Sequence, residues 1–122
     1  MSTNQVYEVL RLSVTVTHPT APDSGDPVRW GDLCGVAITD EGDGNNDAAK
    51  TSVDFGPGVW TMTVSGVNSG GASAVAEGDK LYYTDAQAPV LDKRASGYFF
   101  GYAMGAVGSA ASGAIPVMKT MP

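Results

Sequence analysis

The chain has 122 residues and a formal net charge of −6 at pH 7, with 7 Lys and Arg residues against 13 Asp and Glu residues. This length fits one domain with a modest core, and the acidic balance argues against nucleic acids and anionic membranes as partners, because both repel a negatively charged protein. Cys34 is the single cysteine, which excludes a disulfide framework or a cysteine-rich zinc site. We expect no cofactor.

The chain begins with a polar segment that is followed by a predicted strand. Residues 1–5 include Ser2, Thr3, Asn4 and Gln5 and have little reason to fold alone. Residues 6–17 alternate with a period of two and are rich in β-branched side chains, as in a strand. Charged Glu8 and Arg11 interrupt this stretch, so it does not resemble a secretory signal. We expect an N-terminal arm over residues 1–5, a single β-domain over residues 6–122, and synthesis without export.

Two segments of the chain repeat one pattern. In the first copy, a turn at Gly25 and Asp26 precedes a short apolar strand at 28–30 and a second strand that contains Gly35. In the second copy, a turn at Gly78 and Asp79 precedes a strand at 80–84 and a second strand that contains Gly101. The glycines suit turns with positive φ, and the aspartates suit closure onto their own backbone. The repeat predicts a duplicated supersecondary unit in a closed or nearly closed β-architecture, with these six as structural residues: Gly25, Asp26, Gly35, Gly78, Asp79 and Gly101.

The rest of the chain also favours short strands. They are expected at residues 34–39, 51–55, 59–65, 90–91, 98–106 and 115–118. Within 59–65 the larger apolar residues alternate with threonines, which indicates one buried and one wet face. Residues 40–47 and 68–73 are expected to be polar links, and only a short helical turn near 74–77 or 109–112 is expected. The predicted class is all-β, a small β-barrel or sandwich.

Catalytic residues are scarce in this sequence. His18 is the single histidine, and Cys34 lies in an apolar run, where a thiol is usually a buried, inert side chain. Asp26 and Asp79 could form a symmetric carboxylate pair, but no assisting His or Lys recurs with them. The serine nucleophile elbow and the phosphate-binding glycine loop are both missing from the sequence. We therefore expect no enzymatic activity.

One acidic loop has the spacing of a calcium site. The spacing of the oxygen ligands in a calcium-binding loop is matched in part by Asp43, Asn45, Asp47 and Asp54. However, Ala48 stands where the sharp turn of such a loop needs glycine. A plain solvated turn is the favoured interpretation, with adventitious calcium as the alternative, and no metal site is predicted.

The aromatic residues are the remaining candidates for a contact surface. Strand alternation places Phe100 and Tyr102 on one face and Phe99 on the other. We expect one face to enter the core and the other to contact another subunit, since exposed aromatic surface is typical of interfaces. The alternative is that the aromatics are scattered and half-exposed.

The order of these motifs resembles a family of small tailed-phage capsid decoration, or head-stabilising, proteins. The residues that carry the resemblance include the Gly-Asp units, the Cys34-Gly35-Val36 strand, the Phe55–Trp60 turn and Phe100-Gly101-Tyr102. The resemblance implies a tulip-like β-fold, a homotrimer without catalytic residues, and binding to neighbouring major capsid protein subunits. It also implies an N-terminal segment that reaches toward neighbours.

The leading hypothesis is therefore a protein of the virion that is made in the host cytoplasm, binds the capsid exterior and stabilises the lattice. The candidate contact residues for the capsid or a neighbouring subunit are Ser2, Thr3, Asn4, Gln5, Tyr7 and Phe99. The alternative is a β-module that binds carbohydrate or another small ligand, with Trp30 or Tyr82 stacking on sugar rings.

Overall fold

The computed structural model describes residues 11–42 and 48–120, and within these ranges the chain forms strands and no helix. The prediction of an all-β fold is confirmed. No helix in the described ranges is long and apolar enough to cross a membrane. The strands are β1 (Arg11–Val14), β2 (Pro27–Trp30), β3 (Leu33–Ala37), β4 (Thr51–Asp54), β5 (Gly58–Ser65), β6 (Val67–Asn68), β7 (Gly71–Ala72), β8 (Lys80–Tyr83), β9 (Leu91–Asp92), β10 (Tyr98–Ala103) and β11 (Ser112–Lys119).

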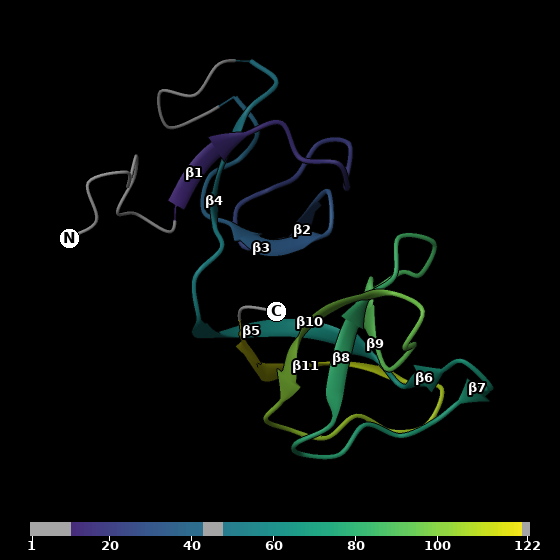
Figure 1. Ribbon diagram of the computed structural model, residues 1–122. Coiled ribbons are helices and arrows are strands. Elements are labelled where there is room, and N and C mark those ends of the chain that lie inside the picture. The colour runs from purple at the N-terminus through teal and green to yellow at the C-terminus, as the bar shows by residue number, and fades with distance from the viewer. Residues whose placement is uncertain (1–10, 43–47, 121–122) are drawn as a thin grey trace.

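The strands form two halves that share one topology (Figure 1). The first half is an open sheet in the order β1-β4-β3-β2, and the second is a closed barrel in the order β10-β11-β5-β9-β8. Taken in chain order, strands β5, β8, β10 and β11 correspond to β1, β2, β3 and β4. In the barrel β5 is paired with β11, β11 with β10 and β10 with β8, as β1 is with β4, β4 with β3 and β3 with β2 in the first sheet. The duplication seen in the sequence therefore extends to two whole four-stranded arrangements.

The two halves close differently. In the barrel, β9 is inserted between β5, to which it is parallel, and β8. In the first half no strand is inserted, and the chain after β1 meets β2 directly through hydrogen bonds from the amides of Thr17 and His18 to the carbonyl of Arg29 (2.8 and 3.1 Å).

Each half has its own hydrophobic core, and β3 contributes to both. Val14, Val28, Ala37, Val53 and Phe55 form the smaller core. Cys34 and Val36, on the opposite face of β3, belong to the barrel core, which they share with residues such as Met62, Val64, Leu81, Tyr83, Leu91, Phe100, Ile115 and Val117. The first half is thus packed onto the barrel through a strand that is buried on both sides.

A β-bulge in β10 overturns the predicted orientation of the aromatics. Tyr82 of β8 pairs with Phe99 but the preceding Leu81 pairs with Gly101, so Phe100 is an extra residue. Such an insertion shifts the alternation of the strand by one residue. Phe100 is fully buried, whereas the rings of Phe99 and Tyr102 contact each other in a T-shaped arrangement at 5.6 Å. The expectation that Tyr102 shares a face with Phe100 was wrong.

The predicted strand positions were otherwise near the observed ones, with differences at the ends. The last strand is longer than expected and pairs with β5 along its whole length. The link at residues 68–73 contains Asn68 of β6 and all of β7, which pair as a small hairpin that was not predicted. The short helical turn considered for residues 74–77 or 109–112 is found in neither segment. The arm over residues 1–5 and the start of the first strand lie outside the described residues.

Polar side chains join the two halves beside β3. Arg29 of β2 donates two hydrogen bonds to the carboxylate of Asp85, which follows β8 (Nε to Oδ1 3.0 Å, Nη2 to Oδ2 2.6 Å). The guanidinium also lies over the ring of Tyr98, 4.3 Å from its centroid. His18 Nδ1 and the hydroxyl of buried Tyr83 share a hydrogen bond of 2.6 Å.

A buried lysine also joins the two halves. Lys119, at the end of β11, is 1% exposed, and its ammonium donates to the carbonyl of Phe55 at 3.2 Å. Burial lowers the pKa of Lys119. A main-chain carbonyl of the first half thus partly replaces the water that this cation loses.

Gly101 is expected to be intolerant of any side chain. A Cβ at Gly101 would lie 2.9 Å from Cα of Lys119 on the neighbouring strand, so Gly101→Ala should lower the free energy of unfolding by about 2 kcal/mol through overpacking. Urea denaturation measures this change. Gly113→Ala is the control, because a Cβ there meets nothing within 4 Å. Equal stability of the two variants would contradict the packing of β10 against β11.

The Arg29 contact is expected to contribute to stability far more than a surface ion pair. The Arg29 side chain is 11% exposed, and Arg29→Ala removes both the hydrogen bonds to Asp85 and the stacking on Tyr98, so we expect a loss of about 2 kcal/mol. Arg11→Ala is the control: the side chain of Arg11 in its pair with Asp54 is 63% exposed, and the loss should stay within about 0.5 kcal/mol.

The same variant should show a pH dependence. In the wild type, the hydrogen bonds from Arg29 lower the pKa of Asp85. The pair therefore stabilises the folded state at pH values above the ordinary pKa of an aspartate, and this contribution is lost as the pH falls below about 4. The stability difference between wild type and Arg29→Ala should therefore shrink in acid. A difference that stays constant from pH 7 to pH 3 would contradict this account.

Candidate interaction surfaces

The outer face of the β5–β11 pair carries no charged side chain. The two strands pair in full register from Gly58 opposite Lys119 to Ser65 opposite Ser112. Val59 and Met118 lie directly opposite each other, and their exposed fractions are 56% and 40%. The exposed side chains of this face are Val59, Thr61, Thr63, Ser112, Ala114, Pro116 and Met118. The face thus lacks the charged side chains that are common on solvated sheet faces and presents a mixture of apolar and hydroxyl side chains.

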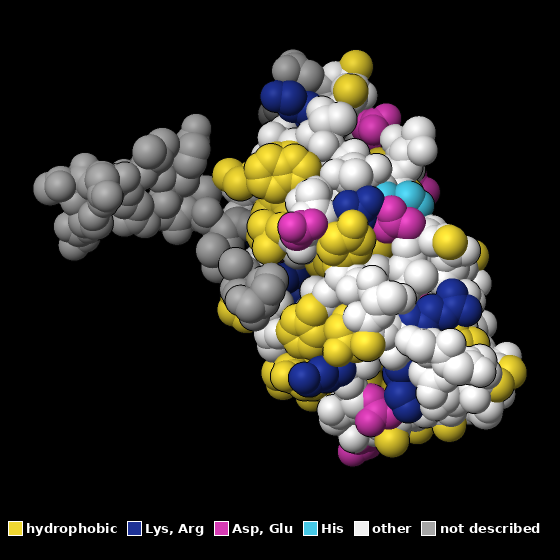
Figure 2. Space-filling view, turned by 45° about the vertical axis from the view of Figure 1, so that its right-hand side comes forward, with side chains coloured by type: hydrophobic (Ala, Val, Ile, Leu, Met, Phe, Trp, Pro, Cys, Tyr) yellow, Lys and Arg dark blue, Asp and Glu magenta, His cyan; other side chains and the backbone are white. Residues whose placement is uncertain are grey.

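Three aromatic rings continue this face onto β10 and β8. Tyr102 pairs with Met118 across β10 and β11, and Phe99 contacts both Tyr102 and Tyr82 in T-shaped arrangements with centroids 5.6 and 5.9 Å apart. We call Val59, Met118, Tyr102, Phe99 and Tyr82 the apolar band. Figure 2 shows hydrophobic side chains gathered toward the left-hand side of both halves.

A second aromatic surface lies on the first half. Trp30 is 40% exposed and packs against Phe55 with a centroid distance of 5.6 Å. An open depression of about 680 Å³ beside it is lined by Thr15, Thr17, Trp30, Gly31, Asp32 and Leu33. Trp30 and Tyr82, the two aromatics considered for sugar stacking, are thus on different halves and do not form one platform.

The two Gly-Asp turns have the same geometry. Gly25 and Gly78 have φ values of 92° and 88°, which side chains rarely adopt. In each turn the amide of the aspartate donates to the carbonyl three residues earlier, at 3.0 and 3.1 Å. In each turn the carboxylate also accepts the amide of that earlier residue, at 2.9 Å in both copies. Asp26 and Asp79 therefore hold the turns closed.

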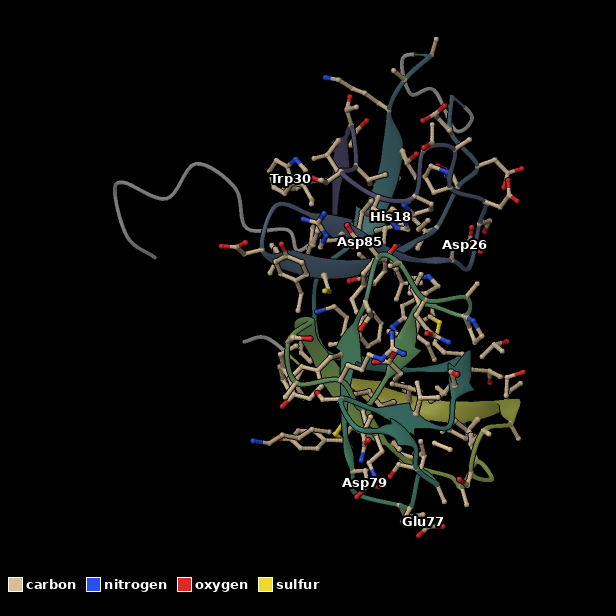
Figure 3. All side chains as sticks on the ribbon, turned by 90° about the vertical axis from the view of Figure 1, so that its right-hand side faces the viewer. His18, Asp26, Trp30, Glu77, Asp79 and Asp85 are labelled. Carbon is tan, nitrogen blue, oxygen red and sulfur yellow. The ribbon has the colours of Figure 1, made fainter. Side chains whose placement is uncertain are left out.

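These two carboxylates do not converge on one site. Figure 3 shows Asp26 near the level where the halves meet and Asp79 at the far end of the barrel. Asp79 forms an ion pair with Lys93 at 3.3 Å. The hydrogen bond from the amide of Ala76 lowers the pKa of Asp79 most, and the hydrogen bond from Lys93 lowers it further. A symmetric acid-base pair of Asp26 and Asp79 is thereby ruled out.

Cys34 and Tyr83 are unsuited to nucleophilic chemistry. Cys34 is 1% exposed, as predicted, and burial raises the pKa of its thiol to about 11, so the thiolate is scarce at neutral pH. Burial likewise raises the pKa of Tyr83, with the carboxylate of Asp85 acting in the same direction. Both side chains are core residues at the junction of the halves.

The described part of the acidic loop does not support a calcium site. Asp54, the proposed last ligand, accepts a hydrogen bond from the amide of Gly56 at 2.9 Å and pairs with Arg11 at 3.3 Å. Residues 43–47, which would supply the other ligands, lie outside the described residues. Within residues 11–42 and 48–120 no group of three or more His, Cys, Asp or Glu side chains is placed to hold a metal ion.

The sequence identified only part of these surfaces. Phe99 lies in the apolar band, while Ser2, Thr3, Asn4, Gln5 and Tyr7 lie outside the described residues, so their proposed contacts stay predictions. Gly35 and Gly101 occupy equivalent places, opposite Val28 and Leu81 in their strand pairs. Sequence reasoning missed Val59, Met118 and Tyr102 as surface residues. Alternation along 58–65 and 112–119 could have indicated the first two, but the bulge hid the third.

Comparison with known proteins gives the family of the chain. Residues 8–118 match the family model described as phage cement protein. Neither the curated proteins nor the solved structures include a significant match. Because the family match spans nearly the whole chain, including both halves and every surface described above, this protein belongs to the phage cement protein family.

Proposed function

We propose that the protein decorates the exterior of a phage head as a homotrimer and stabilises the lattice of the major capsid protein. It would be made in the host cytoplasm and become part of the virion. The family is a structural one, and this role requires no catalysis.

The apolar band is the observation that carries the proposal. Two large aliphatic side chains, Val59 and Met118, are about half exposed and continue into three half-buried aromatic rings. Residues of this size on the outside of a small barrel gain free energy only when another surface covers them. The band supports contact between copies of the chain or with the capsid.

Electrostatics favours copies of the same chain as the occupants of the band. Each copy carries a net charge of −6, so two copies repel each other wherever their acidic surfaces meet. The β5–β11 face, with no charged side chain, is where the copies approach at the lowest electrostatic cost. Three copies joined in this way present three capsid contacts, whose binding is strengthened by avidity.

The stabilising effect follows from linkage. A trimer that binds the assembled shell and not the dissociated subunits shifts the equilibrium toward the shell by an amount set by its affinity and concentration. The protein then acts as a clamp, and the requirement on its structure is stiffness. The duplicated β-scaffold, with two cores joined through β3, supports that requirement.

A charge placed on the apolar band is expected to separate the copies. Val59→Asp and Met118→Asp each put a carboxylate on the uncharged face, which should convert a trimer into monomers in size-exclusion light scattering. Ala111→Asp is the matched control, since Ala111 is exposed outside the band, and it should remain trimeric. All three variants should keep wild-type circular dichroism, because the altered side chains lie on the surface.

Attachment to heads should follow the oligomeric state. Heads that lack the protein should bind wild type and Ala111→Asp, and should withstand a higher temperature once coated, whereas both band variants bind weakly. A wild-type monomer in solution that coats heads as tightly as the control would contradict the assignment of the band to contacts between copies.

The N-terminal arm gives an independent test of capsid contact. Deleting residues 1–5 should weaken attachment to heads without lowering the melting temperature of the isolated protein, because the two cores lie within residues 11–120. Co-sedimentation with heads and thermal denaturation measure the two effects. Unchanged attachment would remove the arm from the capsid contact.

A further inference from the structure

A cavity of about 360 Å³ lies between the two halves. The first half contributes Pro19, Gly25, Asp26 and Pro27, and the second contributes Thr61, Met62, Thr63, Tyr83, Pro89 and Val90. Its volume falls in the range of small-ligand sites. The walls are mostly prolines and other apolar side chains, with the hydroxyls of two threonines.

Asp26 is the one charged residue that lines this cavity. Its carboxylate accepts the amide of Asp23 at 2.9 Å, and no cation pairs with it among residues 11–42 and 48–120. The charge of Asp26 also reaches the phenol of Tyr83 on the opposite wall, where it contributes to the raised pKa. A half-buried carboxylate in an apolar cavity thus lacks a counter-ion.

In the duplicate turn, the equivalent carboxylate has a cationic partner within the same chain. The carboxylate of Asp79 accepts the corresponding hydrogen bond, from the amide of Ala76, and in addition pairs with the ammonium of Lys93 at 3.3 Å. That ammonium is held further by the hydroxyl of Ser73 at 3.2 Å and the carbonyl of Ala74 at 2.9 Å. Two turns of one geometry therefore differ in that only the second has an internal cation.

We propose that the cavity beside Asp26 binds a lysine or arginine side chain of the capsid protein. This rests on the proposed capsid role. The aliphatic stem lies along the prolines and Met62, as long basic side chains do on apolar surfaces, and the charged head pairs with the carboxylate of Asp26. The net charge of −6 attracts such a basic segment over a longer range.

Titration of the isolated, isotope-labelled protein with capped single amino acids tests the cavity without heads. N-acetyl-lysine methylamide and its arginine counterpart should shift the amide signals of the lining residues saturably, and N-acetyl-norleucine methylamide, which has the stem without the charge, should bind at least fivefold more weakly. Asp26→Asn keeps the oxygen that closes the turn and removes the charge, so it should weaken lysine binding at least fivefold. Asp79→Asn is the matched control and should leave it unchanged.

A second variant keeps the test independent of changes at Asp26. Thr63→Lys, on an exposed position of the cavity wall, supplies an internal cation and should abolish binding of the lysine probe. Because Thr63 also lies on the β5–β11 face, size-exclusion light scattering of this variant separates the loss of probe binding from a change in oligomeric state. Equal affinity for the lysine and norleucine probes, or unaltered lysine binding by Asp26→Asn and Thr63→Lys, would overturn the cavity as a cation site.

Binding to heads then identifies the source of the basic side chain. Asp26→Asn should attach to heads at least fivefold more weakly than Asp79→Asn at low salt, with the difference shrinking as salt increases. Equal attachment of these two variants would overturn the capsid protein as the occupant. If wild type failed to attach at all, the proposed capsid role would fail, and with it the capsid occupant, while the probe titration would still decide whether the cavity binds a cation.

Discussion

The burial of β3 on both faces is the constraint on which the rest of this structure depends. Its alternation sends Cys34 and Val36 into the barrel core and Ala37 into the smaller core, so one short strand belongs to two hydrophobic interiors. The barrel core is completed by residues of the first half, whereas the smaller core is built from the first half alone. The Arg29 contact with Asp85 and Tyr98 fixes the relative position of the halves around this strand. The two halves are thus held together by a shared strand and by polar contacts beside it.

Duplication gave the protein two copies of one turn, and their surroundings have diverged. Around Asp79 the chain supplies Lys93, Ser73 and Ala74, so the carboxylate is neutralised internally. Around Asp26 it supplies prolines and a cavity. The same backbone geometry therefore stabilises the end of the barrel in one copy and presents a charge between the halves in the other. Both carboxylates close their turns in the same way, and they differ in whether the chain supplies a cation beside them.

Charge distribution links the fold to the role of a cement protein. The chain is acidic overall, yet the longest strand pair, β5 with β11, carries an outer face without charge. An acidic surface keeps free copies apart and attracts basic segments, whereas a neutral apolar face allows close approach of like-charged copies. The two kinds of surface support the proposed contacts with other copies of the chain and with the phage head.

The sequence by itself determined the all-β class, the two related Gly-Asp units, the burial of Cys34 and the alternation of residues 59–65, because turn residues and a period of two are local properties. The same local logic failed at β10, where the bulge places Tyr102 with Phe99, since a bulge depends on pairing with a distant strand. Only the tertiary structure decided that Asp26 faces a cavity while Asp79 meets Lys93, and that Val59, Met118 and the aromatic rings form one band. These features join residues far apart in the chain, and no local pattern records which of them become neighbours.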